Sequence, residues 1–74
     1  MKKFMKNFNV NDVIYRENPN KIIIYLRDRL LFKGEIKYFN SFTVLGELDV
    51  YTYEYIDREN KTMLIRVLEG VNEI

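Results

Sequence analysis

The first periodic segment of the chain begins after Asn9, a residue type that commonly caps the N-terminus of a helix. The apolar residues that follow it recur at the spacing of one helical face: Val10, Val13 and Ile14. Asn18 precedes Pro19, and the residue before a proline is driven away from helical backbone angles. We therefore expect a short helix that begins at Asn9 and ends at Asn18.

After Pro19 the period of the apolar residues changes to two, the period of a β-strand. Ile22, Ile24 and Leu26 alternate with Ile23, Tyr25 and Arg27, and then Phe32, Gly34, Ile36 and Tyr38 alternate with Lys33, Glu35 and Lys37. These two runs predict antiparallel strands joined by a tight turn at Asp28 and Arg29. Glycine inside a strand is typical of a sharp bend or bulge, so Gly34 favours a strand that serves two sides of a barrel.

The second half of the chain also predicts strands. A turn at Asn40 and Ser41 precedes FTVLGEL, which begins a third strand, and residues 51–68 predict a long hairpin whose loop is residues 58–60. The register of this hairpin places Tyr51 opposite Val67, Tyr53 opposite Ile65, Tyr55 opposite Met63 and Asp57 opposite Lys61, and Asn60 tolerates a positive φ. Residues 71–74 complete a set of five short strands. The expected fold class is mainly β, with an N-terminal helix followed by a strongly bent, five-stranded open barrel.

Length and composition narrow the classes of protein further. A chain of 74 residues forms one domain, residues 1–74, and buries only roughly 60% of the surface that its unfolded form exposes. The sequence contains no Cys and no His, which excludes disulfides and the usual zinc sites, so oligomerisation remains as a source of extra buried surface. The longest apolar runs are far shorter than the roughly 18 residues of a membrane span, and we expect a cytoplasmic protein without a cofactor.

The charges almost cancel, since 12 Lys and Arg residues against 11 Asp and Glu residues give a net charge of +1. A protein that coats nucleic acid has a more basic surface, so any RNA binding would come from local patches or from base stacking. Six Tyr and five Phe residues make stacking available, although most rings of a small β fold belong to its core or interfaces. Residues 1–7 predict a flexible basic tail whose lysines are either solvated charge or an electrostatic arm for RNA.

The run IYLRDRLLFKGEIKYFNSFTVL resembles the first conserved motif of the Sm and Hfq family, and specifically that of Hfq. It has IYL in the first strand, a two-residue turn, Gly and Ile in the second strand, and FNSF where Hfq typically has F-D-x-F. The ending LEGVNEI is similar in spacing to the K-H-A-I-S-T-V stretch that closes Hfq. The resemblance covers nearly the whole chain, although the segment of residues 49–62 is longer than the corresponding segment of the usual bacterial Hfq.

This resemblance implies a ring, usually a homohexamer, in which the strand edges of adjacent subunits pair and each free edge is covered. Such rings are RNA chaperones of post-transcriptional regulation that bind A-rich or U-rich single-stranded RNA and catalyse nothing. The absence of His, Cys and a paired acidic constellation agrees with a protein that is not an enzyme. A second class stays open, a small Sm-like or SH3-like barrel that joins proteins together and binds little RNA.

Two groups of residues match the faces of the Hfq ring. On the pore side, Phe42 matches the ring that stacks on uridine and Ser41 matches its polar neighbour, while an equal alternative is that Phe42 plugs a subunit interface. On the opposite face, where Hfq holds adenines, the resemblance implies four RNA-binding residues: Tyr25, Arg29, Leu30 and Lys33.

The rim and the end of the chain complete the comparison with Hfq. Arg16 and Phe39 match rim positions that contact RNA in Hfq. The Lys-His pair that grips uridine in bacterial Hfq aligns here with Leu68 and Glu69, so the pore of a ring would lose positive charge at this point.

Overall fold

The computed structural model describes residues 8–68, and its first helix, α1 (Val10–Glu17), forms where the apolar spacing predicts it. The Asn9 side chain accepts a hydrogen bond from the backbone N–H of Asp12, and the Asp12 carboxylate accepts one from the N–H of Asn9, each at 2.9 Å. Both bonds satisfy donors that a helix N-terminus otherwise leaves unpaired. At the other end Asn18 takes left-handed angles, with φ of 51°, before Pro19.

Strands β1 (Lys21–Leu26) and β2 (Arg29–Glu35) form the predicted antiparallel hairpin, but its turn, its bulge and its end differ from the prediction. The alternation predicts a second strand as far as Tyr38, whereas β2 ends at Glu35 and a 3₁₀ turn follows. The turn consists of Arg27 and Asp28, because Arg29 already pairs with Leu26, and the positive φ of 57° falls on Arg27. Ile24 pairs with Phe32 whereas Tyr25 pairs with Leu30, so the bulge lies at residue 31. Gly34 is not at the bulge, since it pairs regularly with Ile22, and its φ is not positive.

The connection from β2 to β3 contains no strand, so the expected third strand beginning at Phe42 is wrong. A 3₁₀ turn, η1 (Ile36–Tyr38), and a short helix, α2 (Val44–Glu47), occupy this segment. The Asn40 side chain accepts a hydrogen bond from the N–H of Phe42, and the Asn40 carbonyl accepts one from the Thr43 hydroxyl. These local bonds compete with strand pairing. The backbone of Gly46 approaches Ser41 and Asn11 so closely that an added Cβ would lie 2.6 Å from an oxygen of each.

Strands β3 (Val50–Asp57) and β4 (Thr62–Val67) form the second hairpin. The predicted pairs of Tyr53 with Ile65 and of Tyr55 with Met63 are confirmed. The two outer pairs are wrong because a bulge lies at each end of β3: Val50 faces Val67, and Asp57 faces Thr62. In the loop the positive φ belongs to Lys61, at 52°, and not to Asn60.

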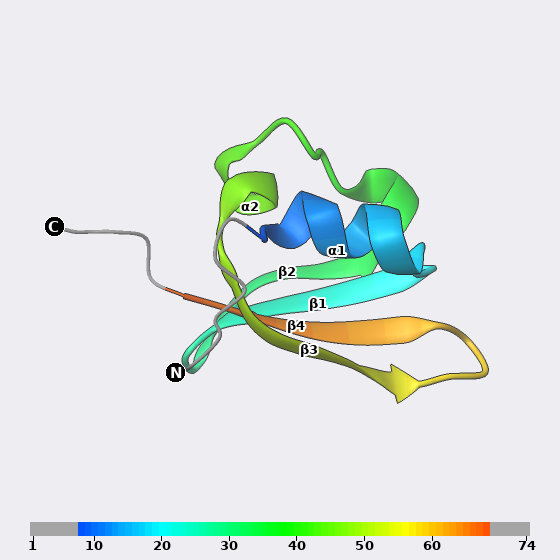
Figure 1. Ribbon diagram of the computed structural model, residues 1–74. Helices are drawn as coiled ribbons and strands as arrows, with labels where there is room; N and C mark the ends of the chain where they lie inside the picture. Colours follow the sequence, from blue (N-terminus) through cyan, green and yellow to red (C-terminus); the bar gives the residue numbers. More distant parts are fainter. Residues whose placement is uncertain (1–7, 69–74) are drawn as a thin grey trace, which may run out of the picture.

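The sheet has the strand order β2, β1, β4, β3, and its two central strands run parallel (Figure 1). Helices α1 and α2 lie on one face, and no element of the described chain crosses the other. The core lies between α1 and the sheet and consists of Val10, Val13, Ile22, Ile24, Val50, Met63, Ile65 and Val67. The hydroxyl of Tyr55 donates to the carbonyl of Glu17 and thereby satisfies an acceptor at the end of α1.

The fold is therefore mainly β, as expected, with a short N-terminal helix and an open sheet of four strands among residues 8–68. The expected basic tail of residues 1–7 and the expected fifth strand of residues 71–74 lie outside the described residues.

Candidate nucleic-acid interface

The sheet face that points away from α1, here called the open face, is defined by the strand registers. Because Ile22 and Ile24 are buried under the helix, their neighbours Ile23 and Tyr25 lie on the other side. Three rows cross this face from β2 to β3: Leu30, Tyr25, Arg66 and Thr52; Lys33, Ile23, Leu64 and Glu54; Glu35, Lys21, Thr62 and Asp57. Ile23, Tyr25 and Leu64 thus form the middle of the open face, Lys21 and Arg66 add charge on the central strands, and the edges carry both signs of charge at Lys33, Glu35, Glu54 and Asp57.

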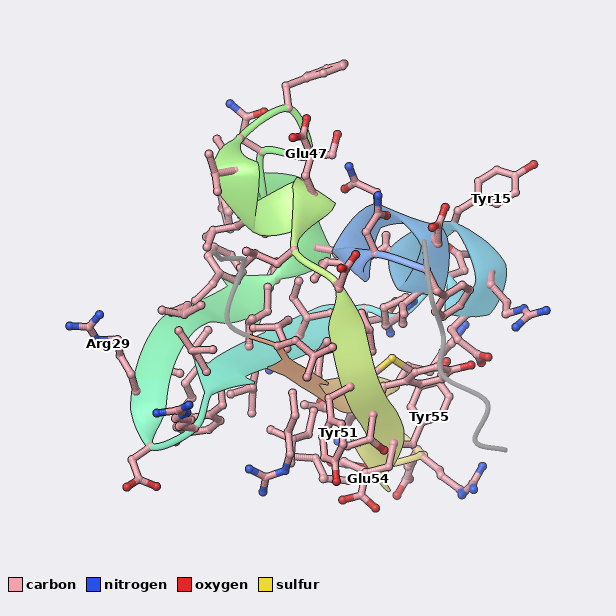
Figure 2. All side chains as sticks on the ribbon, turned by 60° about the vertical axis from the view of Figure 1, so that its left-hand side comes forward. Tyr15, Arg29, Glu47, Tyr51, Glu54 and Tyr55 are labelled. Carbon is pink, nitrogen blue, oxygen red and sulfur yellow. The ribbon has the colours of Figure 1, made fainter. Side chains whose placement is uncertain are left out.

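Three of the four residues expected on one RNA-binding face share the open face. Tyr25 pairs with Leu30 across the first hairpin, and Lys33 lies one row further along β2 beside Ile23. Tyr25 is half-buried, whereas Leu30 is 48% exposed. The fourth residue, Arg29, lies at the start of β2 and projects away from the sheet (Figure 2). The open face therefore combines a tyrosine ring, an apolar side chain and a lysine.

The expected pore-side residues lie on the helical side of the sheet. Ser41 and Phe42 belong to the turn before α2, where the Ser41 carbonyl accepts a hydrogen bond from the Asn11 side chain at 2.9 Å. Phe42 is 92% exposed. The structure thus separates this pair from Tyr25 by the thickness of the sheet and α1.

The two expected rim residues have packing partners. The guanidinium of Arg16 lies over the ring of Phe8, with 5.5 Å between its central carbon and the ring centroid. Phe39 is partly buried and packs edge-on against Phe32 at a centroid distance of 5.1 Å. Phe39 therefore packs at the margin of the core. Of the two expected rim residues, Arg16 is the one with an exposed side chain.

Arg66 and Tyr51 were not among the expected site residues. Arg66 lies beside Tyr25 because β4 runs parallel to β1, a pairing that the sequence pattern did not predict. Tyr51 is 65% exposed and lies at the bulge of β3. Together these residues line a hollow of about 520 Å³ at the end of the sheet, called the end pocket, whose other lining residues are Leu26, Arg27, Val67 and Leu68.

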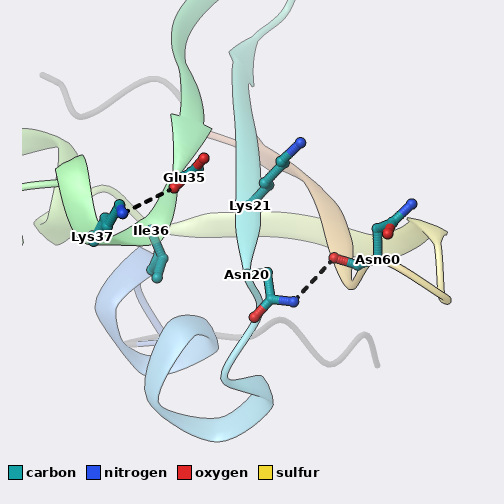
Figure 3. A pocket seen from close by; sticks show the side chains of 6 residues that line it. All are labelled: Asn20, Lys21, Glu35, Ile36, Lys37 and Asn60. Carbon is teal, nitrogen blue, oxygen red and sulfur yellow. Dashed lines mark hydrogen bonds and ion pairs between the residues drawn. The ribbon is translucent and has the colours of Figure 1, made fainter.

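A second hollow, of about 370 Å³, lies where β1 begins and β2 ends (Figure 3). The side chain of Asn20 donates to the carbonyl of Asn60 at 3.3 Å, and Lys37 lies 3.6 Å from the carboxylate of Glu35. Lys21 also lines this hollow. Its cations therefore lie beside a carboxylate, which makes it less suited to an anionic ligand than the end pocket.

One carboxyl group beside the open face has a perturbed acidity. Hydrogen bonds from the side chain and the backbone N–H of Asn60 lower the pKa of Asp57 below its ordinary value of 3.8. These bonds fix the turn between β3 and β4, so Asp57 has a structural partner.

Comparison of the chain with protein-family models, curated proteins and solved structures finds no match of any of the three kinds. Among residues 8–68 no helix is long and apolar enough to cross a membrane. In the same part of the chain no three His, Cys, Asp or Glu side chains gather as possible metal ligands.

Proposed function

We propose that this protein binds single-stranded RNA on the open face. The observation that supports this proposal is the position of Tyr25 between Leu30 on β2 and Arg66 on β4, on a face that no described element covers. Lys33 adds a second cation one row away. A sheet surface that offers a ring for stacking and cations for phosphates is a common platform for unpaired bases.

The near-zero net charge of the chain means that one copy offers few cations to a phosphate backbone. We therefore include in the proposal a homo-oligomeric ring, with a hexamer as the expected form, in which copies repeat the same contact around one RNA strand. Strands β2 and β3 are the edges of the described sheet, and edge pairing between copies would cover them. We also propose that each copy in the ring forms the expected bent barrel of five strands, in which residues 71–74 are the last strand.

In this proposal the protein is a cytoplasmic RNA chaperone of post-transcriptional regulation with a preference for A-rich or U-rich strands. Fluorescence anisotropy with labelled oligo(A) and oligo(U) tests it, with light scattering for the oligomeric state. Base stacking contributes about 1–3 kcal/mol per base, so Tyr25→Ala should weaken binding about 5- to 150-fold.

Tyr15→Ala is the matched control for the Tyr25 variant, because Tyr15 projects from α1 on the opposite side of the molecule and is 91% exposed. Equal affinities of the two variants would overturn the assignment of the open face, and no binding of either oligonucleotide at low salt would overturn the function.

A second candidate function is an interaction module that binds a second copy of itself through the same face. The row of Lys33, Ile23, Leu64 and Glu54 favours it, because this row is cationic at one end, apolar in the middle and anionic at the other. A two-fold axis parallel to the central strands would place Lys33 against Glu54 of the second copy and Ile23 against Leu64. The oligomeric state of charge-exchanged variants separates this candidate from the first.

A further inference from the structure

The end pocket is a second candidate ligand site, separate from the open face. It lies at the end of the sheet where β1 and β4 finish and β3 begins. Its volume of about 520 Å³ falls within the range of small-molecule sites, roughly 300–1,000 Å³. One side of it shares Arg66 with the open face, so the pocket opens beside the proposed RNA track.

Two backbone irregularities place side chains around the end pocket. The register of β3 changes from Val50 opposite Val67 to Thr52 opposite Arg66, and this leaves Tyr51 as the extra residue of a bulge. Arg27 takes a left-handed conformation, with φ of 57°, in the turn after β1. Bulges re-aim side chains, and the positive φ of Arg27 is the geometry that a two-residue hairpin turn requires. Both irregularities occur at residues that line this one hollow.

The chemistry of the lining matches an anionic, flat ligand. Tyr51 offers a largely exposed ring, and Arg66 offers a guanidinium that can form two parallel hydrogen bonds with a phosphate. No described residue of the lining is acidic. The other lining residues are Arg27, which is cationic, and the apolar residues Leu26, Val67 and Leu68. The pocket therefore combines a stacking surface with a phosphate-binding group.

We infer that the end pocket binds a nucleoside monophosphate, with its base on Tyr51 and its phosphate on Arg66. The ligand comes from one of two sources, the phosphorylated end of an RNA strand or a free nucleotide. The first source rests on the proposed RNA-binding function, whereas the second does not.

Calorimetric titration of the full chain with AMP and with adenosine tests the inference. We expect AMP to bind about tenfold or more tightly than adenosine, because the hydrogen bonds to its phosphate are charge-assisted. Arg66→Gln should abolish this difference, and Arg66→Lys, which keeps the charge without the fork, should restore part of it. Tyr51→Ala should weaken binding of both ligands, and Tyr15→Ala should weaken neither. Equal binding of AMP and adenosine, or an unchanged difference in Arg66→Gln, would overturn the inference.

Oligo(A) with a 5′-phosphate, a 3′-phosphate or neither distinguishes the two sources. A phosphate-dependent gain that disappears in Arg66→Gln identifies a strand end as the ligand. AMP binding without such a gain identifies a free nucleotide. AMP binding in a protein that binds no oligonucleotide would retain the pocket and overturn the proposed RNA function, so the two failures are distinguishable. Circular dichroism of each variant checks the fold, and both substituted side chains are exposed in the native protein.

Discussion

Lys33 and Glu54 lie at opposite ends of one row of residues across the open face, with Ile23 and Leu64 between them. This row is self-complementary under a two-fold rotation, since its cationic end then meets the anionic end of a second copy. The next row gives a related pair, because Tyr25 would meet Arg66 and form a cation–π contact. If the open face binds a second copy, exchange of these charges should therefore change self-association.

Exchange of the two charges tests the face-to-face contact. If two copies pack through the open face, Lys33→Glu and Glu54→Lys should each weaken self-association, because each places like charges together. The double variant should recover it. Sedimentation velocity at matched concentrations measures the effect. Equal self-association of the native protein, the two single variants and the double variant would overturn the second candidate function.

The salt dependence of RNA binding should separate the roles of Lys33 and Tyr25. Loss of one phosphate contact reduces the slope of log affinity against log salt by about 0.7 for a single strand. We therefore expect Lys33→Ala to flatten the slope by about that amount in each engaged copy. Tyr25→Ala should lower the affinity at every salt concentration and leave the slope unchanged. Anisotropy titrations at a series of salt concentrations measure both quantities, and a flattened slope in Tyr25→Ala would contradict the stacking role.

Two glycines provide a matched pair for stability. In Gly46→Ala the new Cβ would lie 2.6 Å from the Ser41 carbonyl oxygen, so α2 and its preceding turn must separate, at a cost of about 1–3 kcal/mol in the free energy of unfolding. In Gly34→Ala the atom nearest to the new Cβ is a ring carbon of Phe32 at 3.6 Å, an ordinary contact distance. The substitution also lowers the conformational entropy of the unfolded chain. That variant should be neutral or more stable by up to about 1 kcal/mol. Urea denaturation measures both, and the reverse order of stabilities would contradict the packing of α2.

The acidity of Asp57 should report the turn between β3 and β4. Because Asn60 lowers the pKa of Asp57 in the folded protein, the bonds of this carboxylate contribute to stability above the ordinary pKa of 3.8. The contribution is lost as the pH falls through the lower, folded pKa. Carboxyl carbon NMR should give a pKa below 3.8 for Asp57, and Asn60→Ala should move it upward. A pKa that does not change in this variant would show that the side chain of Asn60 is not the cause.

The first helix and the centre of the second hairpin form as the sequence predicts. The capped helix depends on Asn9 and the proline after Asn18, and the centre of the second hairpin depends on the apolar partners of Tyr53 and Tyr55. The segment FTVLGEL has a strand-like composition, yet Asn40 and Thr43 form local hydrogen bonds that begin a helical turn. Propensity over seven residues was not sufficient to predict this outcome.

In the candidate site too, the sequence pattern predicts neighbours within one hairpin but not neighbours from distant strands. Tyr25, Leu30 and Lys33, three of the four residues that the resemblance assigns to one face, lie together on the open face, whereas Arg29 projects away from the sheet. Arg66 was missed because its neighbour Tyr25 is about forty residues away in sequence, and no local pattern indicates a parallel pair. The alternation predicts a regular pair of Tyr51 with Val67, and only the bulge places Tyr51 at the end pocket.

The parallel pairing of β1 with β4 also bears on how the chain folds. Ile22 and Met63 are neighbours in the core although about forty residues separate them in sequence, so the two hairpins join into one sheet only after a long segment of chain has closed. Because the sheet depends on contacts between distant parts of the chain, we expect folding to be slow for a chain of this length. A nascent chain whose β4 is still inside the ribosome would present a complete β1–β2 hairpin and an unpaired β3, both with free strand edges that a chaperone or another strand could bind.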